Sequence, residues 1–364
     1  MIRLSAPSID RQEERAVGAV LRSGFLVQGK EVKQFEEKIA RYLNVKHAVA
    51  VSSGTSALHL ALLAYGIGPG DEVIIPDYTF PATANVVELA GARPVFADID
   101  PLTFNIDPKG VETLITKKTK AIMPVHLFGQ SADVSPLMRL ARKYKLVVVE
   151  DAACVLGATY KGRKCGTIGD TGCFSFHPRK VITTGEGGVV VTGNKPVADR
   201  LRALRNHGIE YKNNKIDFVM AGFNYRMTEI QAAIGLVQLK KISALILYHR
   251  KIAGLYDAQL RPIEWIETPA IPSYNTHVFQ SYIIRTLRGD RDKFIAYLRQ
   301  NGIEANIGTY ALHKLSFYKN KYHLKASGFP VTERVFRTSV ALPLYEHLSG
   351  VQVKMIADTI RRFR

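Results

Sequence analysis

Short apolar runs alternate with longer amphipathic segments through most of the chain. Runs rich in β-branched residues predict strands, whereas apolar positions spaced three and four residues apart predict helices. Predicted strands lie within 47–53, 68–76, 92–100, 119–129, 146–153, 173–176 and 187–193, and predicted helices at 30–43, 56–67, 81–92 and 136–145. Because this alternation is typical of parallel strands covered by helices on both faces, it predicts an α/β fold with a mostly parallel central sheet.

The pattern changes near residue 225. Residues 226–260 form one long predicted helix, and a strand at 277–287 and helices at 290–302 and 351–363 follow. These segments predict a smaller α+β domain, so we expect a large domain at 1–244 and a small C-terminal domain at 245–364. No polar linker separates the two parts, which predicts close packing between them.

The composition is that of a soluble globular protein. The chain has 364 residues, of which 46% are hydrophobic and 23% charged, enough for about two domains. We expect a mature cytosolic N-terminus, because the first residues are polar, and no membrane-spanning segment, because no apolar run reaches the ~18 residues required. Cys154, Cys165 and Cys173 lack CxxC spacing. This argues against a disulfide framework or a metal site and favours the cytoplasm.

The net charge of +18 has two interpretations. A basic surface binds nucleic acid or an anionic ligand, or it is simply a solvated surface rich in lysine and arginine. The basic residues are spread along the chain in pairs such as Lys117–Lys118 and Arg361–Arg362, without a basic block interleaved with aromatic residues. This distribution favours a solvated surface, and favours a small anionic ligand over nucleic acid.

Two strand ends carry candidate ligand-binding residues. Gly54 and Thr55 follow a predicted strand and begin a helix, where free backbone N–H groups and hydroxyls can bind an anion; an ordinary helix cap explains them equally well. A second apolar strand delivers Glu150 and Asp151 to its carboxyl end, where α/β folds bind ligands. Taken alone, Asp151 reads more readily as a helix cap than as a ligand to a cation.

A third strand end carries Lys180. A single lysine is usually a surface charge, but Lys180 follows a short strand that contains Ser175 and precedes a glycine-rich turn. An anion site, a carboxylate at a strand end and a lysine are the three parts of a pyridoxal phosphate site. The phosphate requires hydrogen-bond donors, the ring nitrogen requires a carboxylate to stay protonated, and the aldehyde requires an amine for a Schiff base.

Six blocks in a fixed order resemble the DegT/StrS family of sugar aminotransferases. They are SSGTSAL, GDEVIIPDYTFPATANVVELAGARPVFADID, VHLFGQSADV, VEDAA with LGA, FSFHPRK with TTGEGG, and NYRMTEIQAAIGLVQL. The similarity extends from residue 24 to about residue 349. It implies the aspartate aminotransferase fold, which is fold type I of the pyridoxal-5′-phosphate enzymes, with a smaller α+β C-terminal domain.

The resemblance assigns the cofactor site residue by residue. Lys180 would form the Schiff base and act as the catalytic residue. Asp151 would pair with the ring nitrogen, and Gly54, Thr55 and Ser175 would hold the phosphate.

Further residues are implied by the same resemblance. Phe80 would stack on the cofactor ring, and Asn224 would reach the phosphate of the neighbouring subunit's cofactor. From the residues alone, Phe80 reads as a core aromatic and Asn224 as a turn residue. Arg226, Tyr310 and His313 would contact the sugar nucleotide.

One position departs from the family pattern. Cys154 stands where the family usually has glutamine or histidine in contact with the ring hydroxyl. By its position Cys154 is counted among the predicted cofactor-binding residues. A thiol is a weak donor on a shorter side chain, however, so the contact with the ring hydroxyl is either absent or made by another residue. Lys180 itself fits the pattern: family members with histidine at that position are dehydratases, so the lysine favours an aminotransferase.

The implied reaction transfers an amino group from an amino acid, glutamate by resemblance, to a nucleotide-linked 4-keto-6-deoxy sugar. The product is an amino sugar nucleotide of the kind used in polysaccharide biosynthesis. The nucleotide (UDP, GDP or dTDP) and a 3-keto acceptor remain open, and the resemblance implies a homodimer with a shared active site. The alternatives are a sugar dehydratase on the same scaffold and a non-catalytic regulatory or nucleic-acid-binding protein.

Overall fold

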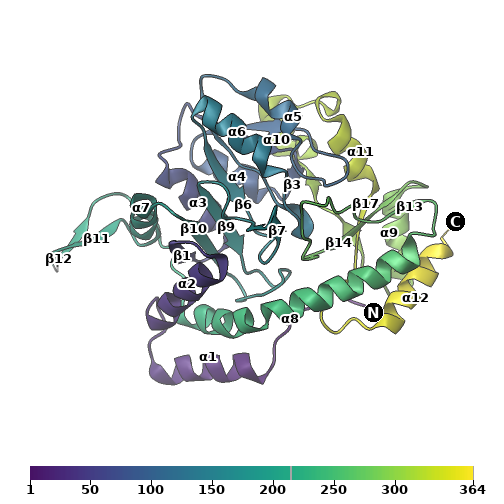
Figure 1. The fold of residues 1–364 in the computed structure, drawn as a ribbon, viewed down its shortest axis with the longest axis horizontal. Helices are drawn as coiled ribbons and strands as arrows, with labels where there is room; N and C mark the ends of the chain where they lie inside the picture. Colours follow the sequence, from purple (N-terminus) through teal and green to yellow (C-terminus); the bar gives the residue numbers. More distant parts are fainter. Residues whose placement is uncertain (214, 364) are drawn as a thin grey trace.

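A seven-stranded sheet forms the centre of the computed structural model, which describes residues 1–213 and 215–363 (Figure 1). In spatial order its strands are β1 (His47–Val51), β10 (Gly188–Thr192), β9 (Thr171–Ser175), β6 (Val147–Asp151), β5 (Thr119–Ile122), β2 (Glu72–Pro76) and β4 (Arg93–Ala97). Strand β10 runs antiparallel to β1 and β9, and all the other neighbours pair in parallel. The predicted mostly parallel sheet is thereby confirmed.

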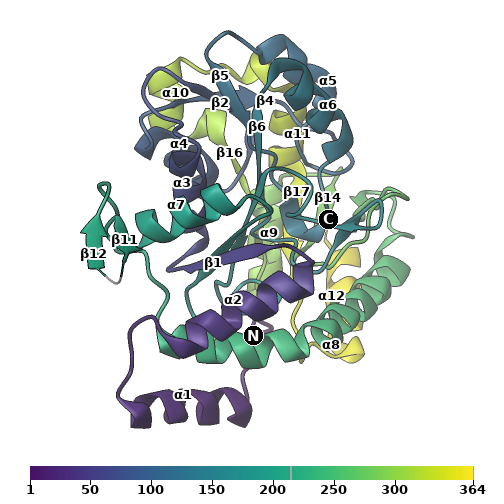
Figure 2. The ribbon, with the colours of Figure 1, turned by 60° about the vertical axis from the view of Figure 1, so that its left-hand side comes forward.

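Helices cover both faces of this sheet, as the near-continuous apolar strands predict (Figure 2). One face packs against α3 (Gly54–Ala64), α4 (Ala82–Leu89) and α7 (Lys195–Arg205), and the other against α2 (Lys30–Leu43), α6 (Val134–Tyr144) and the first half of α8 (Glu229–Leu260). Successive side chains of a strand point to opposite faces. Val49 and Val51 accordingly join the first cluster, and Ala48 and Ala50 the second.

The C-terminal part contains a four-stranded antiparallel sheet. It consists of β13 (Ile266–Glu267), β14 (Tyr282–Thr286), β17 (Ser339–Leu342) and β15 (Asn306–Ile307), packed with α9 (Arg291–Gln300), α12 (Gly350–Arg361) and the second half of α8. Helix α8 is continuous across residues 244 and 245, where we placed the domain boundary. The division at that point stays a prediction.

Shorter elements complete the described chain. Helices are α1 (Arg11–Ser23), α5 (Pro108–Val111), α10 (Ser316–Tyr322) and α11 (Pro330–Thr338), with 3₁₀ turns at Glu112–Leu114, Leu127–Gly129, Leu312–Lys314 and Ala326–Gly328. Two-stranded pairs are β3 (Tyr78–Thr79) with β16 (Tyr310–Ala311), β7 (Thr159–Tyr160) with β8 (Arg163–Lys164), and β11 (Ile209–Lys212) with β12 (Lys215–Phe218). The β11–β12 hairpin projects from the body of the molecule (Figure 1).

The strand predicted at 119–129 is shorter than expected. Strand β5 ends at Ile122, and Pro124 follows, which has no N–H group to donate to a neighbouring strand. Phe128 and Gly129 then turn the chain with φ values of +58° and +113°. Gly129 is required there, because a Cβ would lie 2.8 Å from the backbone nitrogens of Phe279 and Gln280.

Helix α8 corrects the expectation that no apolar segment is long enough to cross a membrane. Within the described residues it is the one helix that reaches the necessary length and composition. Half of its most apolar 18-residue stretch is buried, at 50%. The reason is structural: its N-terminal half packs into the sheet cluster, and its C-terminal half into the core of the C-terminal part. A helix that fills two cores has apolar residues along its whole length, although charged residues remain on its exposed side.

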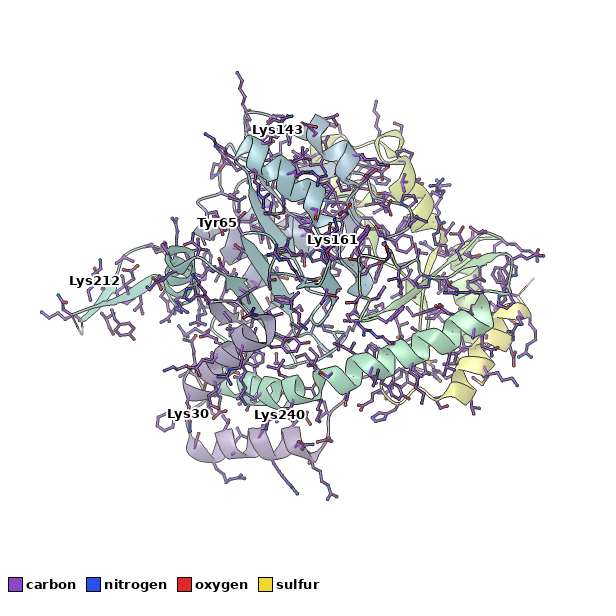
Figure 3. All side chains as sticks on the ribbon, viewed as in Figure 1. Lys30, Tyr65, Lys143, Lys161, Lys212 and Lys240 are labelled. Carbon is purple, nitrogen blue, oxygen red and sulfur yellow. The ribbon has the colours of Figure 1, made fainter. Side chains whose placement is uncertain are left out.

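The exposed lysines that Figure 3 labels come from several separate elements, and only Lys30 and Lys240 lie close together. Figure 3 labels five exposed lysines, Lys30, Lys143, Lys161, Lys212 and Lys240, on five separate parts of the chain. Their separation agrees with the solvated-surface interpretation of the net charge.

Glu229 fixes the position of helix α2 against helix α8. The buried carboxylate accepts hydrogen bonds from the backbone N–H groups of Gly29 (2.8 Å), Glu31 (2.8 Å) and Val32 (2.9 Å). The first N–H groups of a helix lack partners within the helix, and Gly29 at the N-cap has no side chain to supply one. A residue 200 positions away in the sequence therefore caps α2.

We predict that Glu229→Ala lowers stability by about 2 to 4 kcal/mol, because it leaves these N–H groups without an acceptor. The thermal unfolding midpoint should fall by roughly 5 °C. Glu37→Ala, an exposed carboxylate on the same helix α2, is the control and should leave the midpoint within about 1 °C. Equal midpoints for the two variants would contradict the assigned cap.

Candidate active site

The first turn of α3 lies directly against the end of β9. A Cβ placed on Gly54 would lie 2.7 Å from Ser175 Cβ and 3.1 Å from Ser175 Oγ, so only glycine allows this approach. Thr55 is exposed in the same turn, and Ser53 caps it by accepting from the N–H of Ser56 at 3.0 Å. Gly54, Thr55 and Ser175 therefore surround the N-terminus of one helix, where N–H groups and hydroxyls favour an anion such as phosphate.

Asp151 occupies the carboxyl end of β6, on the face covered by α3 and α4. Its side chain is 5% exposed and accepts hydrogen bonds from Thr83 Oγ1 at 2.9 Å and from the N–H of Ala153 at 3.2 Å. Burial raises the pKa of the Asp151 carboxyl, and these bonds and the charge of Lys180 only partly offset that effect. A cation placed opposite Asp151 would favour the ionised form, as a protonated ring nitrogen would.

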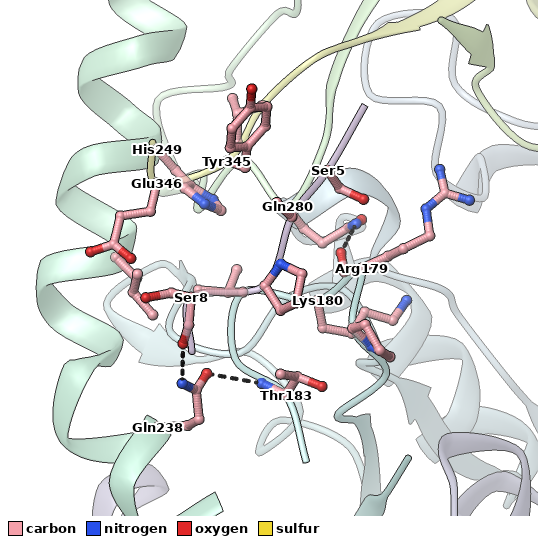
Figure 4. A pocket seen from close by; sticks show the side chains of 16 residues that line it. Ser5, Ser8, Arg179, Lys180, Thr183, Gln238, His249, Gln280, Tyr345 and Glu346 are labelled. Atoms are coloured by element: carbon pink, nitrogen blue, oxygen red, sulfur yellow. Dashed lines mark hydrogen bonds between the residues drawn. The ribbon is translucent and has the colours of Figure 1, made fainter. Parts of the chain in front are cut away.

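Lys180 lies in the turn after β9, where its N–H donates to the carbonyl of His177 at 2.8 Å. Its side chain is half-buried, and Nζ donates to Cys154 Sγ at 3.1 Å. The preceding carbonyl, that of Arg179, accepts from Gln280 Nε2 at 2.7 Å, which ties this turn to the C-terminal part of the chain (Figure 4). These two hydrogen bonds to the main chain fix the turn that carries Lys180.

A small cavity adjoins the turn that carries Lys180 (Figure 4). Segments 5–8, 178–183 and 344–346 and helix α8 enclose about 20 Å³. That volume holds about one water molecule. The cavity is therefore a gap between packed segments and not the place of a cofactor or sugar.

Phe80 and Tyr310 lie beside each other although 230 positions separate them in the sequence. Pairing of β3 with β16 sets Tyr310 opposite Thr79, and the rings of Phe80 and Tyr310 meet edge to face with centroids 6.2 Å apart. Phe80 is 61% exposed and Tyr310 39%. Phe80 is therefore not the core aromatic that its sequence alone suggests, and both rings are free to contact a ligand.

Asn224 and Arg226 lie next to the end of β1. The N–H of Ser52 donates to the carbonyl of Tyr225 at 2.8 Å, which holds this segment beside the first turn of α3. Asn224 is exposed, and Arg226 Nη1 donates to Asn206 Oδ1 at 2.5 Å. The structure thus brings both residues close to Gly54 within one chain.

His313 differs from the expectation that it contacts the sugar nucleotide. It is buried, its Nδ1 lies 2.5 Å from Asp77 Oδ2, and its Nε2 lies 3.1 Å from Glu333 Oε2. Although burial opposes the charge, the hydrogen bonds to Asp77 and Glu333 raise the pKa of His313. Both ring nitrogens are occupied, so His313 anchors the segment that carries Tyr310 and leaves no donor for a substrate.

Sequence reasoning did not single out Thr83 and gave Glu150 no partner. Thr83 holds Asp151, and the signal for it was its position in the helix that follows Phe80. Glu150 points to the opposite face of β6, as strand alternation requires, where it accepts from the N–H groups of Ile168 and Gly169, both at 2.6 Å.

His126 also forms a hydrogen bond with the Glu150 carboxylate. Its Nε2 lies 2.8 Å from Glu150 Oε2, and both side chains are fully buried. Despite burial, the hydrogen bonds from His126 and from the loop at 166–169 lower the pKa of Glu150. The adjacent carboxyl groups of β6 therefore have different tasks: Glu150 fixes a loop, and Asp151 faces the site. Among the described residues, no three or more histidine, cysteine, aspartate or glutamate side chains are grouped so that they could hold a metal ion.

Comparison with known proteins places this geometry in a family. A model described as the DegT/DnrJ/EryC1/StrS aminotransferase family matches residues 7–361. GDP-perosamine synthase from Caulobacter vibrioides is 40% identical over 98% of this chain and 96% of its own length. UDP-4-amino-4-deoxy-L-arabinose–oxoglutarate aminotransferase from Shewanella sediminis is 36% identical over 98% and 96%. The solved PLP form of Spr1654 from Streptococcus pneumoniae has a TM-score of 0.94 at 32% identity, covering 99% of this chain and 97% of that one.

The fold is that of the pyridoxal-phosphate-dependent aminotransferases. The chain belongs to the DegT/DnrJ/EryC1/StrS aminotransferase family, and its cofactor is pyridoxal 5′-phosphate. The residues present fit this cofactor. A Cβ on Gly54 would fill the cradle beside Ser175, and the Asp151 carboxyl is buried where a protonated ring nitrogen would favour its ionised form.

We predict that Gly54→Ala weakens cofactor binding at least tenfold, because the added methyl group must displace Ser175 from the cradle. Titration of the cofactor-free protein with pyridoxal phosphate measures the affinity. Gly193→Ala is the control, since a Cβ there meets no atom within 4 Å. Unchanged affinity in Gly54→Ala would exclude the first turn of α3 as the phosphate site.

Proposed function

We propose that the protein transfers an amino group from L-glutamate to a nucleotide-linked keto-deoxy sugar, a 4-keto-6-deoxy sugar in the first instance. The observation that carries the proposal is the meeting of Lys180, Asp151 and the first turn of α3 at one edge of the sheet. The names of two relatives support the substrate class, since one is a GDP-perosamine synthase and the other forms a UDP-linked 4-amino sugar with oxoglutarate as its partner.

Each residue has a separate task in this proposal. Pyridoxal phosphate supplies an aldehyde that accepts an amine and a ring that takes up electrons when a C–H bond breaks. Lys180 holds the aldehyde carbon and, once displaced by the donor, carries the proton from the donor's α-carbon. Asp151 keeps the ring nitrogen protonated, and Gly54, Thr55 and Ser175 bind the phosphate.

A second group of residues shapes the site around the cofactor. We assign Phe80 to the face of the ring, and Tyr310 and Arg226 to the sugar nucleotide. Asn224 would reach the phosphate in a second copy of the chain, so the active form would be a cytoplasmic homodimer with shared active sites. The exposure of Asn224 supports such a contact, and the positive net charge suits a diphosphate substrate.

The other classes of function have weaker support. A sugar dehydratase of this family would carry histidine in place of Lys180. A nucleic-acid-binding protein would be expected to gather its basic residues on one face, whereas the lysines labelled in Figure 3 do not form one group. Membership in an aminotransferase family gives no support to a nucleic-acid-binding protein.

We predict that the purified protein converts one member of a panel of UDP-, GDP- and dTDP-linked 3-keto and 4-keto sugars to an amino sugar when glutamate is present. Mass spectrometry of the sugar nucleotide and assay of 2-oxoglutarate measure the two products. Lys180→Ala and Lys180→Arg should reduce turnover at least 10³-fold, because the amine that moves the proton is lost or always charged.

The exposed Lys117→Ala serves as the matched control and should keep the wild-type rate. A wild-type rate in Lys180→Ala, or loss of water from the sugar without transfer of nitrogen, would overturn the assignment.

A further inference from the structure

The hydrogen-bond partner of the Lys180 amine is a thiol. Nζ donates to Cys154 Sγ at 3.1 Å, and within residues 1–213 and 215–363 no carboxylate forms an ion pair with it. Asp151 is the acid whose carboxyl feels the charge of Lys180, but its own hydrogen bonds come from Thr83 and Ala153. The sulfur of Cys154 is therefore the atom that orients this amine.

The main chain fixes Cys154 independently of its side chain. The N–H of Ala152 donates to the carbonyl of Cys173 at 2.9 Å, and the N–H of Val155 donates to that of Ala152 at 3.1 Å. The N–H of Ala153 donates to Asp151 Oδ1. These bonds hold the turn at 152–155 against β9, so a change of the Cys154 side chain leaves the backbone of the turn in place.

The orientation of a lysine amine is costly to maintain without a partner. Four rotatable bonds give the free side chain much rotamer entropy, which is lost when the amine is held in one place. A carboxylate partner would hold the amine tightly as an ion pair, whereas sulfur is a weak acceptor that orients it and releases it readily. Such a partner suits an amine that must alternately bond to a cofactor and leave it.

We propose that Cys154 is a positioning residue for Lys180, with Sγ holding Nζ next to Asp151 whenever no C=N bond joins Nζ to the cofactor. This inference rests on the proposed function and deepens it. It gives Cys154 a task other than the contact with the ring hydroxyl that the family pattern has at this position. The contact acts before the cofactor is captured and again after the donor has displaced Lys180.

The capture step depends on this orientation. Nζ gives up a proton to water, adds to the aldehyde carbon and forms the C=N bond, while the aldehyde oxygen leaves as water with the remaining protons. The rate of this step follows the fraction of time for which Nζ points toward the aldehyde carbon. Loss of one weak hydrogen bond should lower that rate roughly fivefold.

The test uses the cofactor-free protein and two ligands. Stopped-flow absorbance after mixing with pyridoxal phosphate gives the rate at which Lys180 captures the aldehyde. Titration with 4′-deoxypyridoxine 5′-phosphate, which keeps the ring hydroxyl and the phosphate but has no aldehyde, gives the affinity of the non-covalent site. The variants are Cys154→Ala, Cys154→Val, which fills the volume without accepting a hydrogen bond, and Cys154→Ser, which still accepts one.

We expect capture to slow roughly fivefold in Cys154→Ala and Cys154→Val and to recover most of the wild-type rate in Cys154→Ser. The affinity for the deoxy analogue should be unchanged in all three. An equal loss of analogue affinity would show that Cys154 contacts the ring and would overturn the inference, as would an unchanged capture rate in Cys154→Ala and Cys154→Val. A wild-type protein that binds neither ligand would instead refute the proposed function.

Discussion

A carboxyl group buried at the end of a strand is unfavourable as an anion unless a positive charge faces it, and Asp151 sets this constraint on the whole site. Thr83 and Ala153 satisfy part of its hydrogen-bonding capacity, and burial still raises its pKa. In the proposed site, the protonated ring nitrogen of pyridoxal phosphate would supply that positive charge. The ring is in turn an effective electron acceptor only while that nitrogen stays protonated, so the stability of the carboxylate and the chemistry of the cofactor depend on the same contact.

The sheet brings the other groups to Asp151 from distant parts of the chain. Three strands end side by side or nearly so: β6 with Asp151, β9 with Ser175, and β1 just before Gly54. The close approach of Gly54 to Ser175 forms the proposed phosphate site, and the turn after β9 positions Lys180. The short strand pair of β3 and β16 brings Phe80 and Tyr310 together. His313 fixes this pair, because its N–H donates to the Asp77 carboxylate. The site is therefore a consequence of strand order, and few of its contacts are local in sequence.

Sequence reasoning predicted the parts that depend on periodicity. The alternation of apolar strands and amphipathic helices was enough for the central sheet, for α8 and for the residue at each strand end. It could not predict which side chains meet across the fold. The sequence could not show that Asp77 and Glu333 occupy both ring nitrogens of His313. It also could not show that the amine of Lys180 donates to Cys154. The hydrogen-bond partners of Glu150 could not be predicted either, because only tertiary packing brings the loop at 166–169 to it.

The central claim is that Lys180 is the amine joined to the cofactor opposite Asp151. Borohydride reduction of the protein with its cofactor converts the C=N bond into a stable C–N bond, and peptide mass spectrometry then locates the label. The account predicts one labelled lysine per chain, Lys180, with no label in Lys180→Ala. Label on another lysine, or an unchanged amount of label in Lys180→Ala, would contradict it.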